Sequence, residues 1–166
     1  MMGQEIDLLA DYPKAKRNLD ERALGKTEEQ RSIARQFGRE FFDGDRSTGY
    51  GGFNYHPRFW QPVIPAFVQH WKLTSLLDVG CAKGFMLYDL REAVPGINVA
   101  GIDISGYAID NGKPEVRDFM SVADAGALPF EDDSFDVVIS INTVHNLERD
   151  ECAQALQEIN RVARQG

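Results

Sequence analysis

The chain has 166 residues, 43% of them hydrophobic and 27% charged, which are the proportions of an ordinary globular protein. Its 18 Lys and Arg residues against 26 Asp and Glu residues give a net charge of −8, which disfavours a nucleic-acid partner. No apolar run approaches the roughly 20 residues that span a bilayer, and the first residues, MMGQEIDLLADYPKAKR, contain no apolar signal segment. We therefore expect a cytoplasmic protein with one main core and no membrane partner.

Residues 1–56 differ in composition from the rest and are predicted to form an N-terminal extension. Residues 1–26 are mostly polar and carry both charge signs, so a loosely held arm is expected. A helix is predicted from Thr27, because Thr27 and Gln30 fit a capping box. The apolar residues that recur along one face of this helix are Ile33, Phe37 and Phe41.

The extension ends in a glycine-rich stretch, DGDRSTGYGGF, at residues 43–53. Its composition by itself favours a flexible linker. The aromatic residues Tyr50 and Phe53 between the glycines instead favour a loop that folds over a ligand and excludes water. The residues leave both interpretations open.

Residues 57–166 alternate between helical and strand patterns and are predicted to form the second unit. A helix over 57–71, interrupted near Pro62 and Pro65, comes first. The elements expected after it are strand 76–79, helix 85–94, strand 98–102, helix 105–112, strands 119–123 and 135–141, and helix 150–163. Strands alternating with helices predict an α/β fold with a doubly wound, mostly parallel sheet.

The stretch SLLDVGCAKGF joins the first strand to its helix and is the first candidate site. Ligands of doubly wound sheets bind beyond the carboxyl ends of the strands, where the strand order reverses. Gly80 and Gly84 remove side chains at this point, so that the backbone can approach a ligand closely. Asp103 ends the second strand in VAGIDIS, where a carboxylate can accept hydrogen bonds from both hydroxyls of a ribose. Together these features predict a ligand that contains a nucleoside.

The glycine spacing is G-x-x-x-G and differs from the G-x-G-x-x-G pattern of pyrophosphate-binding folds, which disfavours a nicotinamide cofactor. Over residues 73–166 the sequence resembles the class I S-adenosylmethionine-dependent methyltransferases. LLDVGCAKG is similar to that family's first motif and VAGIDIS to its second. VADAGALPFEDDSFDVVIS and INTVHNLERDECAQALQEINRVARQG resemble the stretches before and after its fourth strand. Ala82 stands where many members carry a glycine.

The resemblance implies a Rossmann-like fold, S-adenosylmethionine as cofactor, and a set of binding residues. The residues that it places around the cofactor are Asp78, Gly80, Cys81, Ala82, Gly84, Asp103, Ile104, Asp124, Ala125 and Asn142, and the lid hypothesis adds Tyr50. Asp103 would hold the ribose, Ile104 and Asp124 the adenine, and Asn142 the methyl end. For Asp124 a simple turn-capping role stays open, and for Asn142 hydrogen bonding to the backbone alone. No metal ligands are implied.

His145, shortly after the predicted fourth strand, is the candidate general base, because the pKa range of histidine suits proton removal near neutral pH. A purely structural role for this histidine stays open. The predicted function is methyl transfer to an oxygen or nitrogen of a small molecule, sugar-like or a secondary metabolite. The alternative is a non-catalytic cofactor-binding fragment that needs a partner chain or a C-terminal segment.

Members of the family that this chain resembles continue past the last predicted helix into further strands. The strand 135–141 would then lie at the edge of the sheet, and exposed apolar edges invite pairing with another chain. We expect either that two copies associate through this edge or that the sequence is a truncated form. Cys81 and Cys152 are expected to be reduced thiols.

Overall fold

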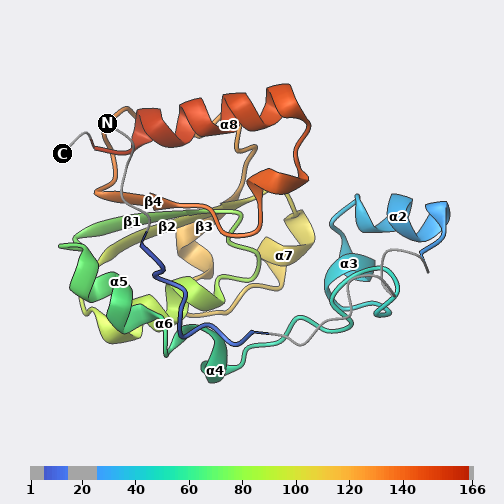
Figure 1. The fold of residues 1–166 in the computed structure, drawn as a ribbon, viewed down its shortest axis with the longest axis horizontal. Coiled ribbons are helices and arrows are strands. Elements are labelled where there is room, and N and C mark those ends of the chain that lie inside the picture. The colour runs from blue at the N-terminus through green and yellow to red at the C-terminus, as the bar shows by residue number, and fades with distance from the viewer. Residues whose placement is uncertain (1–5, 15–25, 165–166) are drawn as a thin grey trace.

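The computed structural model describes residues 6–14 and 26–164 and contains a sheet of four parallel strands (Figure 1). The strands are β1 (Ser75–Val79), β2 (Asn98–Asp103), β3 (Met120–Val122) and β4 (Val137–Ile139). Their order is β3-β2-β1-β4, and every pair is parallel. The predicted α/β fold with a doubly wound parallel sheet is confirmed.

The chain builds the sheet outward from β1 to β3 and then returns to the other side of β1 with β4. Asp78 shows the result, because it is in register with Gly101 of β2 on one side and Ile139 of β4 on the other. The strand order therefore reverses at β1, and the loops that follow β1 and β4 meet at the carboxyl end of the sheet.

Helices cover both sides of this sheet. The segments before it are α2 (Glu28–Ala34), α3 (Arg39–Phe42), α4 (Pro57–Trp60) and α5 (Ile64–His70). The segments within and after it are α6 (Phe85–Ala93), α7 (Gly106–Asp110), the 3-10 turns η1 (Arg117–Phe119) and η2 (Val144–Asn146), and α8 (Arg149–Val162). In Figure 1, α8 lies along one side of the sheet and α5 and α6 lie on the other, while α2 and α3 lie beyond α7.

The core follows from this sandwich, because β1 is covered on both faces and all five of its residues are buried. Leu76 belongs to the larger hydrophobic cluster, which includes α5 and α6. Leu77 and Val79 point the other way and pack with Phe135 and Val162 near α8. The alternation along the strand thus explains why apolar residues are needed on both faces of β1.

The N-terminal helix is broken, so the prediction of one continuous stripe through Ile33, Phe37 and Phe41 is wrong. The capping box of Thr27 and Gln30 is present and starts α2 as predicted. Phe37 then has a φ of 48°, in the left-handed region, and Gly38 precedes α3. The Phe37 carbonyl accepts a hydrogen bond from the Ser105 hydroxyl instead of continuing the helix. Tertiary contact with α7 therefore overrides the helical periodicity.

Residues 6–14 are not the loosely held arm that the composition predicts. Leu8, Leu9 and Tyr12 pack against the larger hydrophobic cluster, and the Tyr12 ring lies 5.0 Å from that of Trp60. The other residues of the predicted arm, 1–5 and 15–25, lie outside the described residues. These few apolar residues hold the segment against the core. The overall composition of residues 1–26, which is mostly polar, did not predict this contact.

The fourth strand is shorter than the predicted range of 135–141. Phe135 lies outside β4 and forms an isolated parallel bridge with Ala163. The Phe135 N–H donates to the Val162 carbonyl (3.0 Å), and the Arg164 N–H donates to the Phe135 carbonyl (2.9 Å). Residues at and after the end of α8 thus pair with Phe135, the first residue of the strand that was predicted to lie at the edge of the sheet.

Two further expectations concern single features. Cys81 and Cys152 are both free thiols, as predicted, and Cys81 is buried. None of the helices in the described ranges has the length and apolar character needed to cross a membrane.

Candidate functional site

The turn after β1 is held against β2 by its backbone. The N–H groups of Gly80 and Cys81 both donate to the carbonyl of Ile102, at 2.8 and 2.9 Å. Gly80 and Gly84 have φ values of 91° and 72°, which glycine adopts without strain. The turn is therefore a fixed structure at the carboxyl end of the sheet, immediately before α6 begins at Phe85.

Gly80 is also a point of close approach. A Cβ atom built on Gly80 would lie 1.9 Å from Oγ1 of Thr143, in the loop that follows β4. At Gly84 a Cβ would lie 2.4 Å from Sδ of Met120 at the start of β3. The loops after β1 and β4 thus meet at Gly80, where the strand order reverses. Sequence reasoning missed Thr143, and no pattern in the sequence singles it out.

Asp103 ends β2 as predicted and is hydrogen-bonded on both oxygens. Its Oδ2 accepts from the Ala82 N–H (2.8 Å), and its Oδ1 accepts from the Ser105 N–H (2.9 Å). Burial raises the pKa of Asp103, and these two hydrogen bonds oppose that shift. Each carboxylate oxygen can accept more than one hydrogen bond, so Asp103 can receive further donors. Its position ties the turn after β1 to the start of α7.

Ala82 departs from glycine at a position where the conformation matters. Its φ is 49°, in the left-handed region, where a Cβ atom costs roughly 1–2 kcal/mol. The hydrogen bond from the Ala82 N–H to Asp103 helps to hold this conformation. The alanine methyl group therefore carries a conformational cost at this position that a glycine would not.

Asp78 is a buried carboxyl group directly before the turn. Burial, followed by the neighbouring charge of Asp103, raises the pKa of Asp78 to about 7. Among the residues that the structure describes, no hydrogen bond counters this shift. A positive charge placed near this carboxylate would therefore be favoured. Cys81 lies in the same region and packs in the larger hydrophobic cluster, and burial raises the pKa of its thiol well above the usual value; its predicted contact with the cofactor stays a prediction.

Two large apolar side chains flank Asp103 and are exposed. Ile104, the next residue along the chain, is 58% exposed, and Val122, which is in register with Asp103 on β3, is 54% exposed. Exposed apolar side chains beside a carboxylate suit a flat ring that is joined to a sugar with hydroxyl groups. Ile104 was a predicted site residue, and Val122 is an addition from the structure.

The loop after β3 contains Asp124 and Ala125. Asp124 is exposed, and its Oδ1 accepts from the Gly126 N–H at 2.7 Å. This is the turn-capping role that the sequence left open. The predicted contact of Asp124 with an adenine stays a prediction, as does the role of Ala125.

The loop after β4 contains Asn142 and His145. Because β4 ends at Ile139, Asn142 lies in the loop and not at the end of the strand, with a φ of 57°. His145 lies in η2 and is exposed. Thr143, between them, is the residue that meets the turn after β1. The predicted roles of Asn142 and His145 remain predictions.

The glycine-rich loop is ordered against the site. The Tyr50 ring is 39% exposed and lies 4.6 Å from the Phe53 ring, and Phe53 stacks on Phe85 at the start of α6 (5.2 Å). The aromatic residues between the glycines thus serve as packing contacts, which a flexible linker would not provide. Whether Tyr50 touches a ligand stays a prediction.

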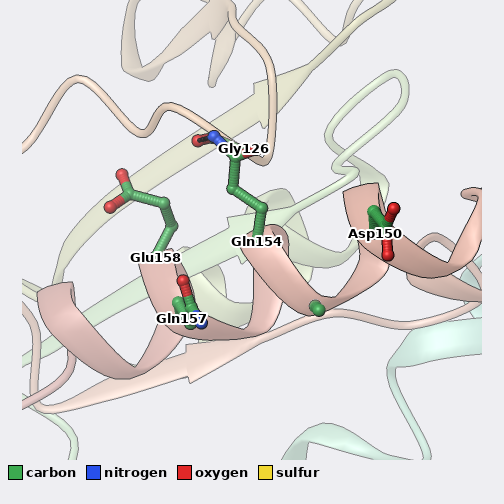
Figure 2. Close-up of a pocket in the computed structure, with 6 residues that line it drawn as sticks. Gly126, Asp150, Gln154, Gln157 and Glu158 are labelled. Atoms are coloured by element: carbon green, nitrogen blue, oxygen red, sulfur yellow. Dashed lines mark hydrogen bonds between the residues drawn. The ribbon is translucent and has the colours of Figure 1, made fainter.

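A separate hollow of about 390 Å³ lies between α8 and the turn at Gly126 (Figure 2). Its lining residues are Gly126, Asp150, Ala153, Gln154, Gln157 and Glu158. Gln154 donates to the Gly126 carbonyl (2.8 Å), and Glu158 accepts from the Leu128 N–H (2.8 Å). These polar groups serve local structure, so the hollow is not the candidate site. The described residues contain no group of three or more His, Cys, Asp or Glu that could hold a metal ion.

Comparison with known proteins agrees with this geometry. Residues 77–166 match the family model described as a methyltransferase domain, so the chain belongs to that family. The fold is that of the class I S-adenosylmethionine-dependent methyltransferases.

Particular relatives can now be named. The chain is 32% identical over 112 residues to a demethylmenaquinone methyltransferase of Roseiflexus sp. (strain RS-1), covering 66% of this chain and 46% of that protein. It is 34% identical over 127 residues to a demethylmenaquinone methyltransferase of Staphylococcus aureus (strain Newman), covering 74% and 52%. The chain thus spans about half the length of the curated relatives it matches.

Solved structures give the same fold. The PH0226 protein from Pyrococcus horikoshii OT3 matches with 30% identity and a TM-score of 0.54, over 60% of this chain and 49% of that one. A putative S-adenosylmethionine-dependent methyltransferase from Methanococcus maripaludis matches in fold alone, with 19% identity and a TM-score of 0.55, over 64% and 52%.

Proposed function

We propose that the protein binds S-adenosylmethionine at the turn after β1 and catalyses methyl transfer to a small-molecule acceptor. The observation that carries this proposal is the Asp103 carboxylate, which links the glycine turn to α7 at the point where the strand order reverses. When bound, the cofactor supplies a methyl group activated by a sulfonium. Membership of the methyltransferase-domain family supports the same assignment.

The residues of the site fit such a cofactor. The glycine at position 80 lets the Thr143 side chain, from the loop after β4, lie directly against the turn after β1. Asp78 is a buried carboxyl group whose pKa is raised by burial and by the charge of Asp103, which suits a cationic ligand. Ile104 and Val122 offer exposed apolar surface beside Asp103. A sugar, a ring and a positive charge are thus each matched by a group of this chain.

The work of the protein follows from these groups. Asp103 accepts hydrogen bonds from ribose hydroxyls and so fixes the nucleoside end. Asp78 stabilises positive charge near the turn. The loop after β4, with Asn142 and Thr143, borders the methyl end and orients the acceptor, and such positioning contributes about 7–11 kcal/mol to a transfer reaction. His145 is the candidate base if the acceptor carries a proton.

The acceptor class is the finer part of the proposal. The two relatives are named for demethylmenaquinone, which favours a quinone-like ring as acceptor. The sequence interpretation favoured an oxygen or nitrogen of a sugar-like or secondary metabolite. We propose the ring acceptor first, because it rests on identity above 30% to named relatives. Transfer of labelled methyl groups to a panel containing demethylated quinones, sugars and phenols distinguishes the two.

The first test is direct binding. Calorimetric titration with S-adenosylmethionine, its demethylated product and NAD should give binding for the first two compounds and none for NAD. Asp103→Asn should weaken the affinity by at least about 100-fold, since two charge-assisted hydrogen bonds of about 1.5–3 kcal/mol each are lost. A wild-type protein that binds neither adenosyl compound contradicts the proposal.

A second candidate function is cofactor binding without transfer by this chain alone. It is favoured by one observation, that the curated relatives are about twice as long as the part matched here. Binding of S-adenosylmethionine with no methyl transfer to any acceptor of the panel would support this candidate. Transfer to any one acceptor would contradict it.

A further inference from the structure

The N-terminal segment reaches the cofactor turn through one carboxylate, Asp43. Both of its carboxylate oxygens accept a hydrogen bond from Lys83 Nζ, at 2.8 and 2.7 Å. The same carboxylate accepts from the Tyr107 hydroxyl (2.6 Å) and from the Phe53 N–H (3.0 Å). Lys83 also donates to the Phe53 carbonyl (3.0 Å). A single side chain from the extension thus joins three separate segments of the chain.

The ion pair between Lys83 and Asp43 is largely buried. The side chain of Lys83 is 7% exposed and that of Asp43 is 24% exposed. A lysine that is buried to this degree needs a charged partner, because an unpaired charge in the interior is very costly. Burial alone would raise the pKa of Asp43, but the hydrogen bonds from Lys83 and Tyr107 hold it below its usual value. Asp43 is therefore ionised at neutral pH.

The two partners of Asp43 adjoin the two groups that hold Asp103. Lys83 follows Ala82, whose N–H donates to Asp103 Oδ2. Tyr107 lies on α7 shortly after Ser105, whose N–H donates to Asp103 Oδ1. A displacement of either partner would therefore move a donor to the predicted ribose-binding carboxylate.

Neighbouring contacts strengthen this junction. The Ser105 hydroxyl donates to the Phe37 carbonyl, and the Phe42 ring stacks on that of Tyr107 with centroids 6.4 Å apart. Phe53 stacks on Phe85, which is the first residue of α6. The segment 37–55 is thereby docked on the loops after β1 and β2 together.

We propose that Asp43 is a positioning residue for the cofactor site, which acts through Lys83 and Tyr107 on Asp103. The inference rests on the proposed function, since it concerns the affinity for S-adenosylmethionine. It extends that function to the N-terminal segment, which lies outside the region matched by the family model. The segment 37–55 is in this view a part of the binding site.

The test compares Asp43→Asn with Glu40→Gln. Glu40 is a matched control, because it lies on α3, the helix that Asp43 caps at its C-terminal end, and pairs with Arg39 at the surface, where the two side chains are 52% and 67% exposed. Asp43→Asn should weaken S-adenosylmethionine binding by about tenfold or more, measured by calorimetry, while Glu40→Gln should leave it unchanged. If transfer is measurable, the KM for the cofactor should rise more than kcat falls.

A second variant shows whether the effect passes through Lys83. Lys83→Met should weaken binding in a similar way, and the double variant Asp43→Asn, Lys83→Met should lose little more than either single variant, since both remove the same ion pair. Additive losses would contradict a shared route. Circular dichroism and thermal unfolding establish that each variant is folded before its affinity is compared.

A readout without cofactor completes the test. Limited proteolysis of the cofactor-free proteins should cut residues 44–55 faster in Asp43→Asn than in the wild type or in Glu40→Gln. Faster cutting with unchanged affinity would show a merely structural tie and overturn the inference, as would variants that match the wild type in both measurements. A wild-type protein that does not bind S-adenosylmethionine would instead overturn the proposed function itself.

Discussion

The two ends of the parallel sheet differ in how their carboxyl groups are satisfied. At the amino end, Asp136 precedes β4, and its Oδ2 accepts from the N–H groups of Thr74 (3.2 Å) and Ser75 (2.9 Å) and from the Thr74 hydroxyl. Arg164 pairs with its other oxygen. The hydrogen bond from Thr74, together with those from Arg164 and Ser75, lowers the pKa of Asp136. Both oxygens of this acid are thus held by groups of the chain itself.

The carboxyl end is different, because its acids are buried and their pKa values are raised. Burial dominates the shift at both Asp78 and Asp103. Ala82 and Asn142 adopt left-handed conformations in the loops of this end, and Ile104 is exposed. Strained backbone and buried charge are costly for stability and are frequent at functional sites. The acids at one end of the sheet are thus satisfied by the fold itself, while those at the other lie where the ligand site is proposed.

The largest expected effect comes from Gly80→Ala. The added Cβ would clash with Thr143, and the φ of 91° would strain any residue with a side chain, so unfolding should become easier by about 2–5 kcal/mol. Cofactor binding should be lost, as measured by calorimetry.

Gly96→Ala is the control, because Gly96 has a similar φ of 85° but a Cβ atom added there would meet nothing within 4 Å. Gly96→Ala should lower the free energy of unfolding by about 1–2 kcal/mol, the cost of a left-handed conformation without a clash, and should leave cofactor binding intact. If the two substitutions weakened cofactor binding equally, the proposal that only the carboxyl end of the sheet binds the cofactor would be contradicted.

The next effect is a pH dependence of cofactor affinity. The pKa of Asp78 is raised to about 7, so the carboxyl is mostly protonated at pH 6 and mostly ionised at pH 8. A cationic ligand binds the ionised form, so affinity should rise with pH by up to about tenfold over this window.

Asp78→Asn should flatten that profile, because the titrating group is then absent. Calorimetry at several pH values, with the same titration of the ligand in both proteins, makes this comparison. An equally steep profile in the variant would show that another group, on the protein or the ligand, is responsible.

The smallest expected effect on binding comes from Asp136→Asn, at the amino end. The variant should lose about 2 kcal/mol of stability at pH 7, since charge-assisted hydrogen bonds are removed, and should bind the cofactor like the wild type. Because the folded pKa of Asp136 is lowered, its contribution is present above about pH 4 and is lost as the pH falls further, so the two proteins should converge in acid.

Asp132→Asn is the control for this substitution, since Asp132 is 73% exposed and its ion pair with Arg161 should contribute little. Thermal unfolding from pH 3 to 7 measures both variants. A binding defect in Asp136→Asn would show that the amino end is not purely structural.

Local patterns predicted much of this molecule. The apolar run of β1, the capping box at Thr27 and the acid at the end of β2 are each decided by neighbouring residues, so they could be predicted correctly. The break of the N-terminal helix between Ala34 and Arg39 could not be predicted, since the Phe37 carbonyl within that break accepts a hydrogen bond from Ser105, far along the chain. The same holds for the shortened fourth strand, whose Phe135 is paired with Ala163.

By itself the sequence determined the order of strands and helices, the glycine turn at residues 80–84 and the acid at position 103, because hydrophobic periodicity and turn chemistry act over a few residues. Only the tertiary structure decided that Thr143 lies against Gly80 and that Asp43 pairs with Lys83. Those contacts join segments that are distant in the chain, and they arise from packing and from the cost of leaving a buried charge unpaired. No local sequence pattern predicts either contact.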